Sequence, residues 1–206
     1  MDYVIMAGGE YKDFTIPKQL SVVKGEVLIA RTIRLLKENG VKDIFISSND
    51  KRFDKYAPRL ENPKNDFVVE KGNSTGYWLD AFYPIQNKVC YIFGDVYFTE
   101  EAIKTIVEYE TNENVLFGTG IAKNEEHQNW GEPFAYKVNK YNEFMNGINE
   151  VKKLFDEGKI NRHPIVWELY RYLHNLDINI QRITTDYVVI DDGTIDIDSP
   201  EQVSRL

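Results

Sequence analysis

The stretch Tyr3-Val4-Ile5-Met6-Ala7-Gly8-Gly9 decides the fold that we predict. Four apolar residues stop at a small residue and two glycines, which is typical of a buried strand that runs into a tight loop. Residues 27–39 follow with apolar side chains at helical spacing, and Gly40 stands where a helix commonly ends. Residues 41–47 then have the pattern of a second strand. A strand, a crossover helix and a second strand predict a parallel sheet with a right-handed connection.

The same alternation of strands and helices continues along the rest of the chain. Ser199-Pro200-Glu201-Gln202 predicts a short terminal helix, because a capping hydroxyl precedes a proline and a glutamine follows three residues on. The fold class that we predict is α/β, a single-domain, Rossmann-like three-layer α/β/α sandwich around a mostly parallel central sheet. The expected elements are a turn at 24–26, strands at 67–70, 88–93, 114–121, 133–138, 178–183 and 187–190, and helices at 74–85, from Thr99, at 141–157 and at 164–175.

The charge balance excludes some classes of partner. Lysine plus arginine number 25 and aspartate plus glutamate number 33, so the formal net charge is −8. Duplex nucleic acid and anionic membranes both favour a basic face, and we expect neither as the main partner. The beginning of the sequence lacks the pattern of a signal peptide, and no apolar stretch approaches the roughly 20 residues that span a bilayer. The single cysteine, Cys90, excludes an internal disulfide and suits a reducing cytoplasm, where we expect the protein to be located.

The length of 206 residues suits one domain, and no linker, repeat or low-complexity tract marks a boundary. We therefore treat 1–206 as a single domain, with an insertion that shapes a substrate site around 123–176. The aromatic residues, 13% of the chain, would suit a homodimer interface. Val166, Trp167, Tyr170 and Leu173 fall at helical spacing and indicate either core packing or a dimer contact.

Three places follow apolar runs, where the ligand of an open parallel sheet lies. The loop 7–20 contains Gly8 and Gly9, whose backbone can approach a phosphate closely, and Lys12 and Lys18 as phosphate partners. This loop matches neither a P-loop nor a dinucleotide fingerprint. A simple turn at the two glycines stays open as the alternative.

The other two places supply carboxylates. Gly94-Asp95 follows one strand, and Asp196-Ile197-Asp198 precedes the terminal helix. Two carboxylates, Asp95 and Asp198, that converge on one point suit Mg²⁺, which usually takes one or two carboxylates plus water and phosphate oxygens. The alternative is that Asp95 caps a turn and that Asp196 or Asp198 begins an Asx turn.

These three places together resemble a known family. Residues 5–9, Pro17-Lys18-Gln19-Leu20 and residues 23–29 look like the opening signature of the nucleotidyltransferases with the glycosyltransferase-A-like fold. Phe93-Gly94-Asp95-Val96 resembles the Gly-Asp step at which that family binds metal. Residues 197–201, Ile-Asp-Ser-Pro-Glu, resemble its C-terminal element, most familiar in cytidylyltransferases. The match runs along the whole chain in the right order.

The resemblance implies a Mg²⁺-dependent transfer of a nucleoside monophosphate, with CMP favoured, from a nucleoside triphosphate to a small phosphorylated acceptor, releasing pyrophosphate. It implies that Lys18 steadies the charge of the α-phosphate and that Asp95 and Asp198 hold Mg²⁺. The family usually carries an arginine between Gly9 and Pro17, and Lys12 would replace its charge here. The nucleotide-binding residues that the resemblance implies are Ala7, Gly8, Gly9, Glu10, Lys18, Asn73, Ser74, Thr75, Gly76, Gly94 and Asp95.

The acceptor site is expected in the less regular half of the chain. Trp130 and Glu132 stand in a segment dense in polar groups, and Arg162 precedes a helix whose N-terminus would receive an anion. A packing role for the tryptophan, and a purely capping role for Asn73 or Ser74, stay open as structural alternatives.

Two other functions stay open. A glycosyltransferase that uses a nucleotide-sugar would share the fold, although Asp95-Val96-Tyr97 lacks the second aspartate that such enzymes usually carry after a central strand. A non-catalytic nucleotide-binding module would be consistent with the missing arginine.

Overall fold

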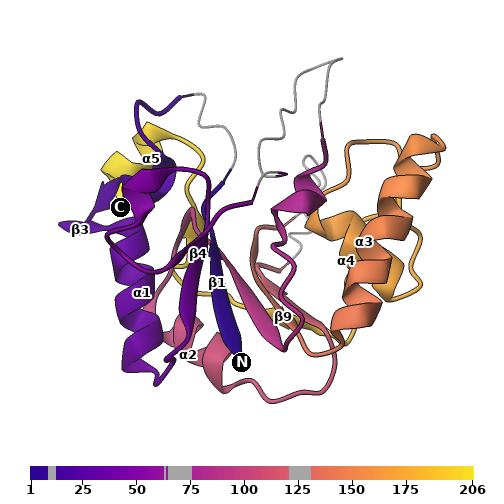
Figure 1. The fold of residues 1–206 in the computed structure, drawn as a ribbon, viewed down its shortest axis with the longest axis horizontal. Helices are drawn as coiled ribbons and strands as arrows, with labels where there is room; N and C mark the ends of the chain where they lie inside the picture. Colours follow the sequence, from indigo (N-terminus) through magenta and orange to yellow (C-terminus); the bar gives the residue numbers. More distant parts are fainter. Residues whose placement is uncertain (9–12, 63, 65–75, 121–130) are drawn as a thin grey trace.

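A seven-stranded sheet forms the centre of the computed structural model, which describes residues 1–8, 13–62, 64, 76–120 and 131–206 (Figure 1). The strand order is β10-β8-β9-β6-β1-β4-β5. All pairs are parallel except the two that β9 makes with β6 and β8. The strands are β1 (Asp2–Met6), β4 (Ile44–Ser47), β5 (Arg59–Leu60), β6 (Val89–Phe93), β8 (Val115–Gly118), β9 (Pro133–Val138) and β10 (Tyr187–Val189).

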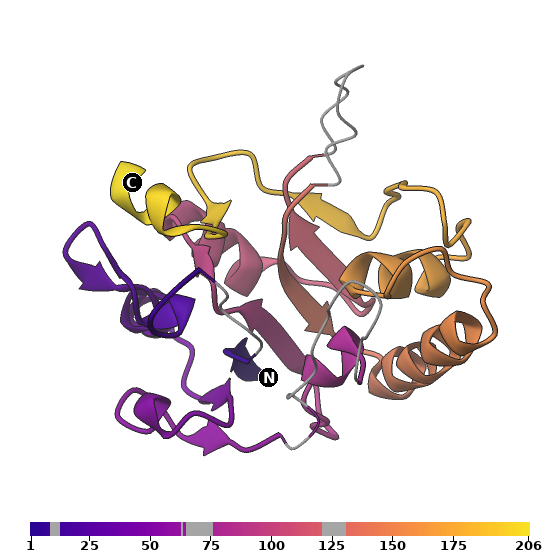
Figure 2. The ribbon, with the colours of Figure 1, turned by 90° about the horizontal axis from the view of Figure 1, so that it is seen from above.

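Helices cover both faces of this sheet (Figures 1 and 2). The helices α1 (Leu28–Glu38) and α2 (Glu100–Glu108) pack together on one face. The helices α3 (Tyr141–Asp156) and α4 (Val166–Leu173) pack together on the other. The predicted three-layer α/β/α architecture with a mostly parallel sheet is therefore confirmed.

The central strands consist of apolar residues because they are buried in the core. Every residue of β6 is buried, because helices lie on both faces of the sheet. Val166, Trp167 and Tyr170 are also fully buried, so the apolar stripe of α4 is core packing within this chain. Across the residues that the structure describes, no helix is long and apolar enough to cross a membrane.

The local signals at the ends of α1 are confirmed. Gly40 adopts φ +81°, and the N–H groups of Gly40 and Val41 donate to the carbonyls of Lys37 and Leu36, which closes the helix in a Schellman arrangement. Lys24 and Gly25 both have positive φ and form the two-residue turn between β2 (Val22–Val23) and β3 (Glu26–Val27).

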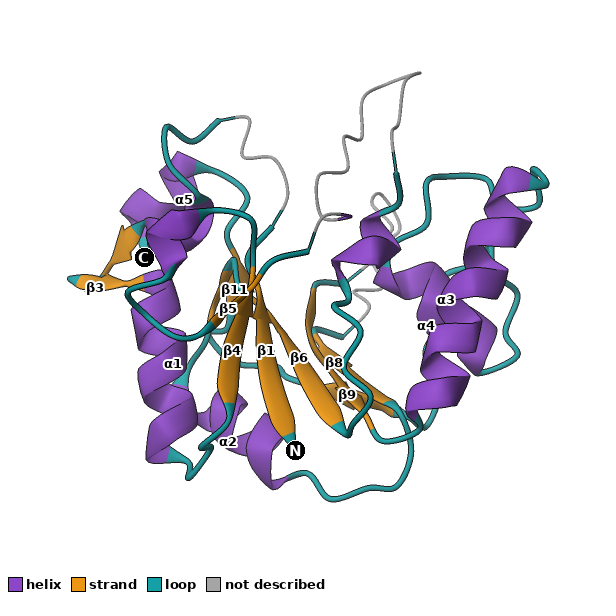
Figure 3. Ribbon diagram, in the orientation of Figure 1, coloured by secondary structure: helices purple, strands orange, loops and turns teal. Residues whose placement is uncertain are grey.

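Short elements complete the chain (Figure 3). The strand β7 (Val96–Tyr97) pairs with β11 (Ile195–Asp196) in a separate antiparallel ribbon that the sequence pattern did not predict. The terminal helix α5 (Pro200–Arg205) is present with its predicted capping box. The 3₁₀ helices are η1 (Lys18–Leu20), η2 (Lys51–Phe53) and η4 (Trp78–Ala81).

Two predicted elements are wrong. The helix expected at 74–85 is only the single turn η4 within its described part. Pro84 disfavours helical backbone at the preceding residue. The side-chain amide of Asn62 donates a hydrogen bond to the carbonyl of Asp80 at 2.7 Å, so this carbonyl is bonded outside a helix. The strand expected at 178–183 begins as a turn instead. Arg171 donates to the carbonyl of Ile178 at 2.8 Å, and Oδ1 of Asp177 accepts from the N–H of Asn179. The strand expected at 67–70 lies outside the described residues.

Gly94 packs closely against the end of β1, and we predict that Gly94→Ala destabilises the fold. An added Cβ would overlap the carbonyl oxygen of Met6 and lie 3.2 Å from Cγ of Gln19. The cost of such overpacking is about 1–3 kcal/mol in the free energy of unfolding, measurable by urea denaturation. Gly193→Ala is the matched control, since its Cβ would meet only ordinary contact, at 3.6 Å from Thr99. Equal stability of the two variants would contradict the close packing at Gly94.

Candidate functional site

The chain segments predicted to carry chemistry meet at one edge of the sheet. Ala7 and Gly8 follow β1, and Gly94 and Asp95 follow β6, the strand paired with β1 in parallel register. The N–H of Gly94 donates to the carbonyl of Met6 at 3.0 Å, so the segments that follow β1 and β6 begin close together. Glu132 stands immediately before β9 and reaches the same edge because β9 runs in the opposite direction. The reversed strand thus adds a side chain to the carboxyl edge.

Lys18 lies at the centre of the charged groups on this edge. Pro17 begins the turn η1, which carries Lys18 back over the end of β6. The Nζ atom of Lys18 donates to Oδ2 of Asp95 at 3.2 Å and lies 3.7 Å from Oδ1 of Asp198. Burial opposes its charge, but the attraction of Asp95, Asp196 and Asp198 outweighs burial and raises the pKa of Lys18. The side chain therefore stays cationic at neutral pH.

The C-terminal segment reaches this edge by pairing with the chain that follows Asp95. Asp196 of β11 lies opposite Val96 of β7, and the N–H of Ile197 donates to the carbonyl of Asp95 at 3.0 Å. Ile197 is fully buried in a small apolar cluster. The two aspartates that flank it are therefore held next to Asp95, about a hundred residues away in the sequence.

The capping box of α5 fixes the backbone at Asp198. Oε1 of Gln202 accepts from the N–H of Asp198 at 2.5 Å and from the N–H of Ser199 at 2.9 Å. The Asp198 carboxylate itself is 68% exposed and contacts the site through Lys18. The structure thus places Asp198 at the edge of the sheet where the sequence predicted it. Its side chain is more exposed to solvent than that of Asp95.

Asp196 is the residue of this group to which sequence reasoning gave no role in the site. Its N–H donates to Oε2 of Glu132 at 3.1 Å, while its own Oδ1 is buried with no hydrogen-bond partner among the described residues. Burial and the charges of Asp95 and Asp198 raise the pKa of Asp196 far above its ordinary value, against the attraction of Lys18. The only signal in the sequence was its place in the run 196–198. A buried carboxylate oxygen without a hydrogen-bond partner in the described part of the chain, beside other acids, is suited to binding a cation.

These carboxylates suit Mg²⁺. Asp95 and Asp196 line the same cavity, and the buried Oδ1 of Asp196 has no hydrogen-bond partner within the described ranges. Within the described part of the chain, no group of three or more histidine, cysteine, aspartate or glutamate side chains is placed so that it could hold a metal ion by itself. Mg²⁺ does not require such a cage, because it commonly takes one or two carboxylates and completes its shell with water and phosphate oxygens.

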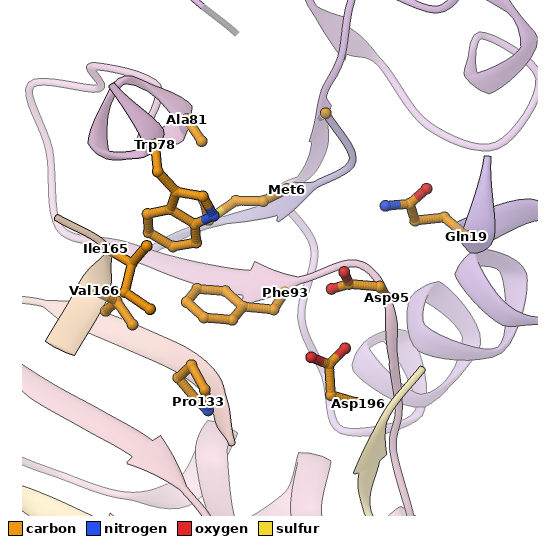
Figure 4. A pocket seen from close by; sticks show the side chains of 11 residues that line it. Met6, Gln19, Trp78, Ala81, Phe93, Asp95, Pro133, Ile165, Val166 and Asp196 are labelled. Atoms are coloured by element: carbon orange, nitrogen blue, oxygen red, sulfur yellow. The ribbon is translucent and has the colours of Figure 1, made fainter. Parts of the chain in front are cut away.

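A cavity of about 210 Å³ opens beside the carboxylates (Figure 4). Gly8, Gln19, Asp95 and Asp196 form its polar end. Gln19 is almost fully buried, and its Oε1 has no hydrogen-bond partner in the described residues. The remaining lining is apolar: Met6, Trp78, Ala81, Phe93, Pro133, Ile165 and Val166.

The Trp78 side of the cavity is tied to the layer that contains α3. The N–H of Trp78 donates to Nε2 of His163 at 3.2 Å, which places the imidazole proton on Nδ1. Tyr77 stacks on His163 and donates through its hydroxyl to Asp156 at 2.6 Å. Lys152 forms an ion pair with Asp80. The turn η4 and the residue before it are thus held at Tyr77, Trp78 and Asp80, and these contacts fix the adjacent side of the cavity.

The predicted site residues divide into three groups. Ala7, Gly8, Gly94, Asp95, Lys18, Asp198 and Glu132 are brought to the same edge of the sheet. Gly76 precedes the turn η4, whereas Arg162 pairs with the buried Glu168 at 2.9 Å and does not line the cavity. Outside the described residues lie Gly9, Glu10, Lys12, Asn73, Ser74, Thr75 and Trp130.

We predict that Ile197→Ala loosens the C-terminal segment. The side chain is fully buried, so its truncation should cost about 2–5 kcal/mol of stability. Ile180→Ala, at a site that is 59% exposed, is the matched control and should change the unfolding free energy by less than about 0.5 kcal/mol. Chemical denaturation measures both. Equal losses would show that Ile197 does not anchor this segment.

We predict that His163 makes the fold less stable in mild acid. Burial lowers the pKa of His163, against the attraction of Glu168, whereas the unfolded chain keeps a pKa of about 6.5. Between these two pKa values the unfolded chain binds more protons, so stability falls as the pH drops below about 6.5.

The thermal midpoint of His163→Gln should therefore fall less between pH 7.5 and 5.5 than that of the wild type. Burial also lowers the pKa of His174. Part of the fall in thermal midpoint should therefore remain in His163→Gln. An identical fall in both proteins would contradict the role of His163.

No family model matches the sequence, and no curated protein sequence matches it. Solved structures do resemble the fold. The CTP:phosphocholine cytidylyltransferase of Streptococcus pneumoniae is 17% identical with a TM-score of 0.53, and the match covers 99% of this chain and 96% of that one. A putative glucose-1-phosphate thymidylyltransferase of Bacillus anthracis is 14% identical with a TM-score of 0.60, covering 99% and 92%.

The inositol-1-phosphate CTP transferase of T. maritima is also 14% identical with a TM-score of 0.60, and the match covers 97% of this chain and 90% of that one. These matches extend over nearly the whole of each chain, in agreement with the resemblance that the motifs indicated. The chain therefore has the fold of the nucleotidyltransferases.

Proposed function

We propose that this protein is a nucleotidyltransferase that moves a nucleoside monophosphate from a nucleoside triphosphate to a small phosphorylated acceptor. The observation that carries the proposal is Lys18 held against Asp95 and Asp198, beside a buried oxygen of Asp196 that has no hydrogen-bond partner among the described residues. A fixed cation among converging acids, next to the glycine that follows β1, is an arrangement for binding a polyphosphate together with a divalent metal ion.

The reaction is a displacement at phosphorus. An oxygen of the acceptor phosphate forms a bond to the α-phosphorus of the triphosphate. The bond from the α-phosphorus to the oxygen that bridges to the β-phosphorus breaks, and its electron pair leaves with that oxygen in pyrophosphate. The product is the nucleoside monophosphate joined to the acceptor phosphate through a new P–O–P bridge.

The described side chains would act by position and charge. Lys18 would exchange part of its ion pairing with Asp95 and Asp198 for the triphosphate, since its Nζ is a point donor with several hydrogen-bond directions. Gly8 presents backbone without a side chain, so a phosphate can approach closely. Groups fixed before the reaction need little rearrangement as charge develops, which is how such sites accelerate transfer.

Asp95 and Asp196 are the residues that would hold Mg²⁺, with Asp198 as a further candidate from the sequence motif. When bound, the ion would neutralise triphosphate oxygens and help to orient the donor. Glu132 would keep Asp196 in place through the backbone N–H that it accepts.

CTP is the donor that we favour. The C-terminal element resembles that of cytidylyltransferases, and two of the three solved structures described above are named for CTP-dependent transfer. The location in the cytoplasm and the homodimer stay predictions.

Pyrophosphate release tests this function. The protein is incubated with Mg²⁺, one of the five nucleoside triphosphates CTP, UTP, GTP, ATP and dTTP, and a panel of small phosphorylated acceptors. We expect pyrophosphate to form with CTP and to require an acceptor. No pyrophosphate from any donor across the panel would contradict the proposal, whereas tight donor binding without turnover would favour a non-catalytic binding module.

Lys18→Met should lower turnover by about 10²–10³-fold, because it removes a cation that faces the developing charge. Lys42→Met, at an exposed lysine before β4, is the matched control and should leave turnover unchanged. Circular dichroism establishes that both variants fold. Wild-type turnover in folded Lys18→Met would remove Lys18 from the site.

A further inference from the structure

Glu132 lies beside the cavity, and the sequence predicted it as an acceptor-binding residue. Among the described residues, Pro133 lines the cavity and Glu132 does not. The carboxylate of Glu132 reaches β11 instead, where its Oε2 accepts from the N–H of Asp196 at 3.1 Å. This hydrogen bond joins the start of β9, in the seven-stranded sheet, to a strand of the separate two-stranded ribbon.

The bond from Glu132 holds the side of β11 that faces away from β7. Asp196 lies opposite Val96 in the antiparallel pair, and the N–H of Ile197 donates to the carbonyl of Asp95 at 3.0 Å. Successive backbone groups of a strand point to opposite edges, so the N–H of Asp196 points away from β7. Because β11 has only two residues, the contact with Glu132 is a large part of what fixes its backbone.

Glu132 is itself fixed on the central sheet. Its N–H donates to Oγ1 of Thr119 at 2.8 Å, and the N–H of Thr119 donates to the carbonyl of Glu132 at 2.9 Å. Gly118, at the end of β8, packs so closely that an added Cβ would overlap the same carbonyl oxygen. The position of Asp196 is therefore fixed relative to the central sheet through the side chain of Glu132.

The side chain that this bond positions belongs to the proposed metal site. Asp95 and Asp196 both line the cavity (Figure 4), and Oδ1 of Asp196 is buried without a hydrogen-bond partner among the described residues. Mg²⁺ demands near-ideal octahedral geometry, so it is sensitive to the position of each carboxylate. Groups that orient a metal ligand without touching the metal commonly change metal affinity by about 10–100-fold when they are removed.

We propose that Glu132 is a positioning residue, which holds the backbone of Asp196 so that the Asp196 carboxylate meets a divalent cation beside Asp95. This inference rests on the proposed nucleotidyl transfer with Mg²⁺. It assigns Glu132 neither to the acceptor nor to direct contact with the metal. The role requires only an oxygen that accepts the N–H of Asp196, so a neutral amide at position 132 fulfils it as well as a carboxylate does.

The Mg²⁺ dependence of CTP binding tests this role. The thermal midpoint is measured at a fixed concentration of CTP while Mg²⁺ is varied. We expect Glu132→Ala to need at least about tenfold more Mg²⁺ than the wild type for half of the full shift. Glu132→Gln should need no more than the wild type, because its Oε1 can accept the same N–H. Glu108→Ala, at an exposed position at the end of α2, is the matched control and should keep the wild-type requirement.

Amide hydrogen exchange in the metal-free protein tests the hydrogen bond itself. We expect the N–H of Asp196 to exchange at least about tenfold faster in Glu132→Ala than in the wild type, and at the wild-type rate in Glu132→Gln. The N–H of Ile197 is bonded to Asp95 and should stay protected in all three proteins. Equally fast exchange of both amides in Glu132→Ala would show that Glu132 holds the whole ribbon and would overturn the specific role at Asp196.

The outcomes separate this inference from the proposed function. An unchanged Mg²⁺ requirement in Glu132→Ala would overturn the inference and leave nucleotidyl transfer standing. A requirement that rises as much in Glu132→Gln as in Glu132→Ala would also overturn it, because the carboxylate itself would then be needed. A wild-type protein that CTP with Mg²⁺ does not stabilise would contradict the proposed function, and this inference with it.

Discussion

The convergence of Asp95, Asp196 and Asp198 on Lys18 is the constraint on which the rest of this structure depends. Three carboxyl groups at one edge of a sheet make ionisation of Asp196 unfavourable, and burial of Asp196 disfavours its charged form further. Lys18, at 3.2 Å from Asp95 and 3.7 Å from Asp198, offsets part of that cost. A cluster of this kind is expected at a functional site, where a bound cation would stabilise the ionised carboxylates.

Much of the fold can be understood as the means of holding that cluster together. The parallel pairing of β1 with β6 places Gly8 beside Asp95. The ribbon of β7 and β11, the buried Ile197 and the cap formed by Gln202 bring in the C-terminal aspartates. None of these contacts is large, but each constrains the backbone within a residue or two of a carboxylate.

The sequence predicted the fold and the carboxylate edge because both depend on local signals. The βαβ unit has clear apolar periodicity, and the capping box at Ser199 is a four-residue pattern. The ribbon of β7 and β11 was not predictable, since two-residue strands have no periodicity. The helix at 74–85 was predicted wrongly because its apolar spacing also suits a buried turn, which Asn62 and His163 stabilise from distant positions. The role of Asp196 likewise depended on burial, which sequence spacing does not reveal.

The central claim is that this edge binds a nucleoside triphosphate together with a divalent metal ion, and thermal unfolding with CTP tests it most directly. The account predicts that CTP raises the thermal midpoint with Mg²⁺ and much less with a chelator. Ligand at about a hundred times its dissociation constant should stabilise the fold by roughly 2.7 kcal/mol. The folded variant Asp196→Asn should lose most of that stabilisation. An equal rise in the presence of chelator, or no rise with any of the five nucleoside triphosphates, would contradict the account.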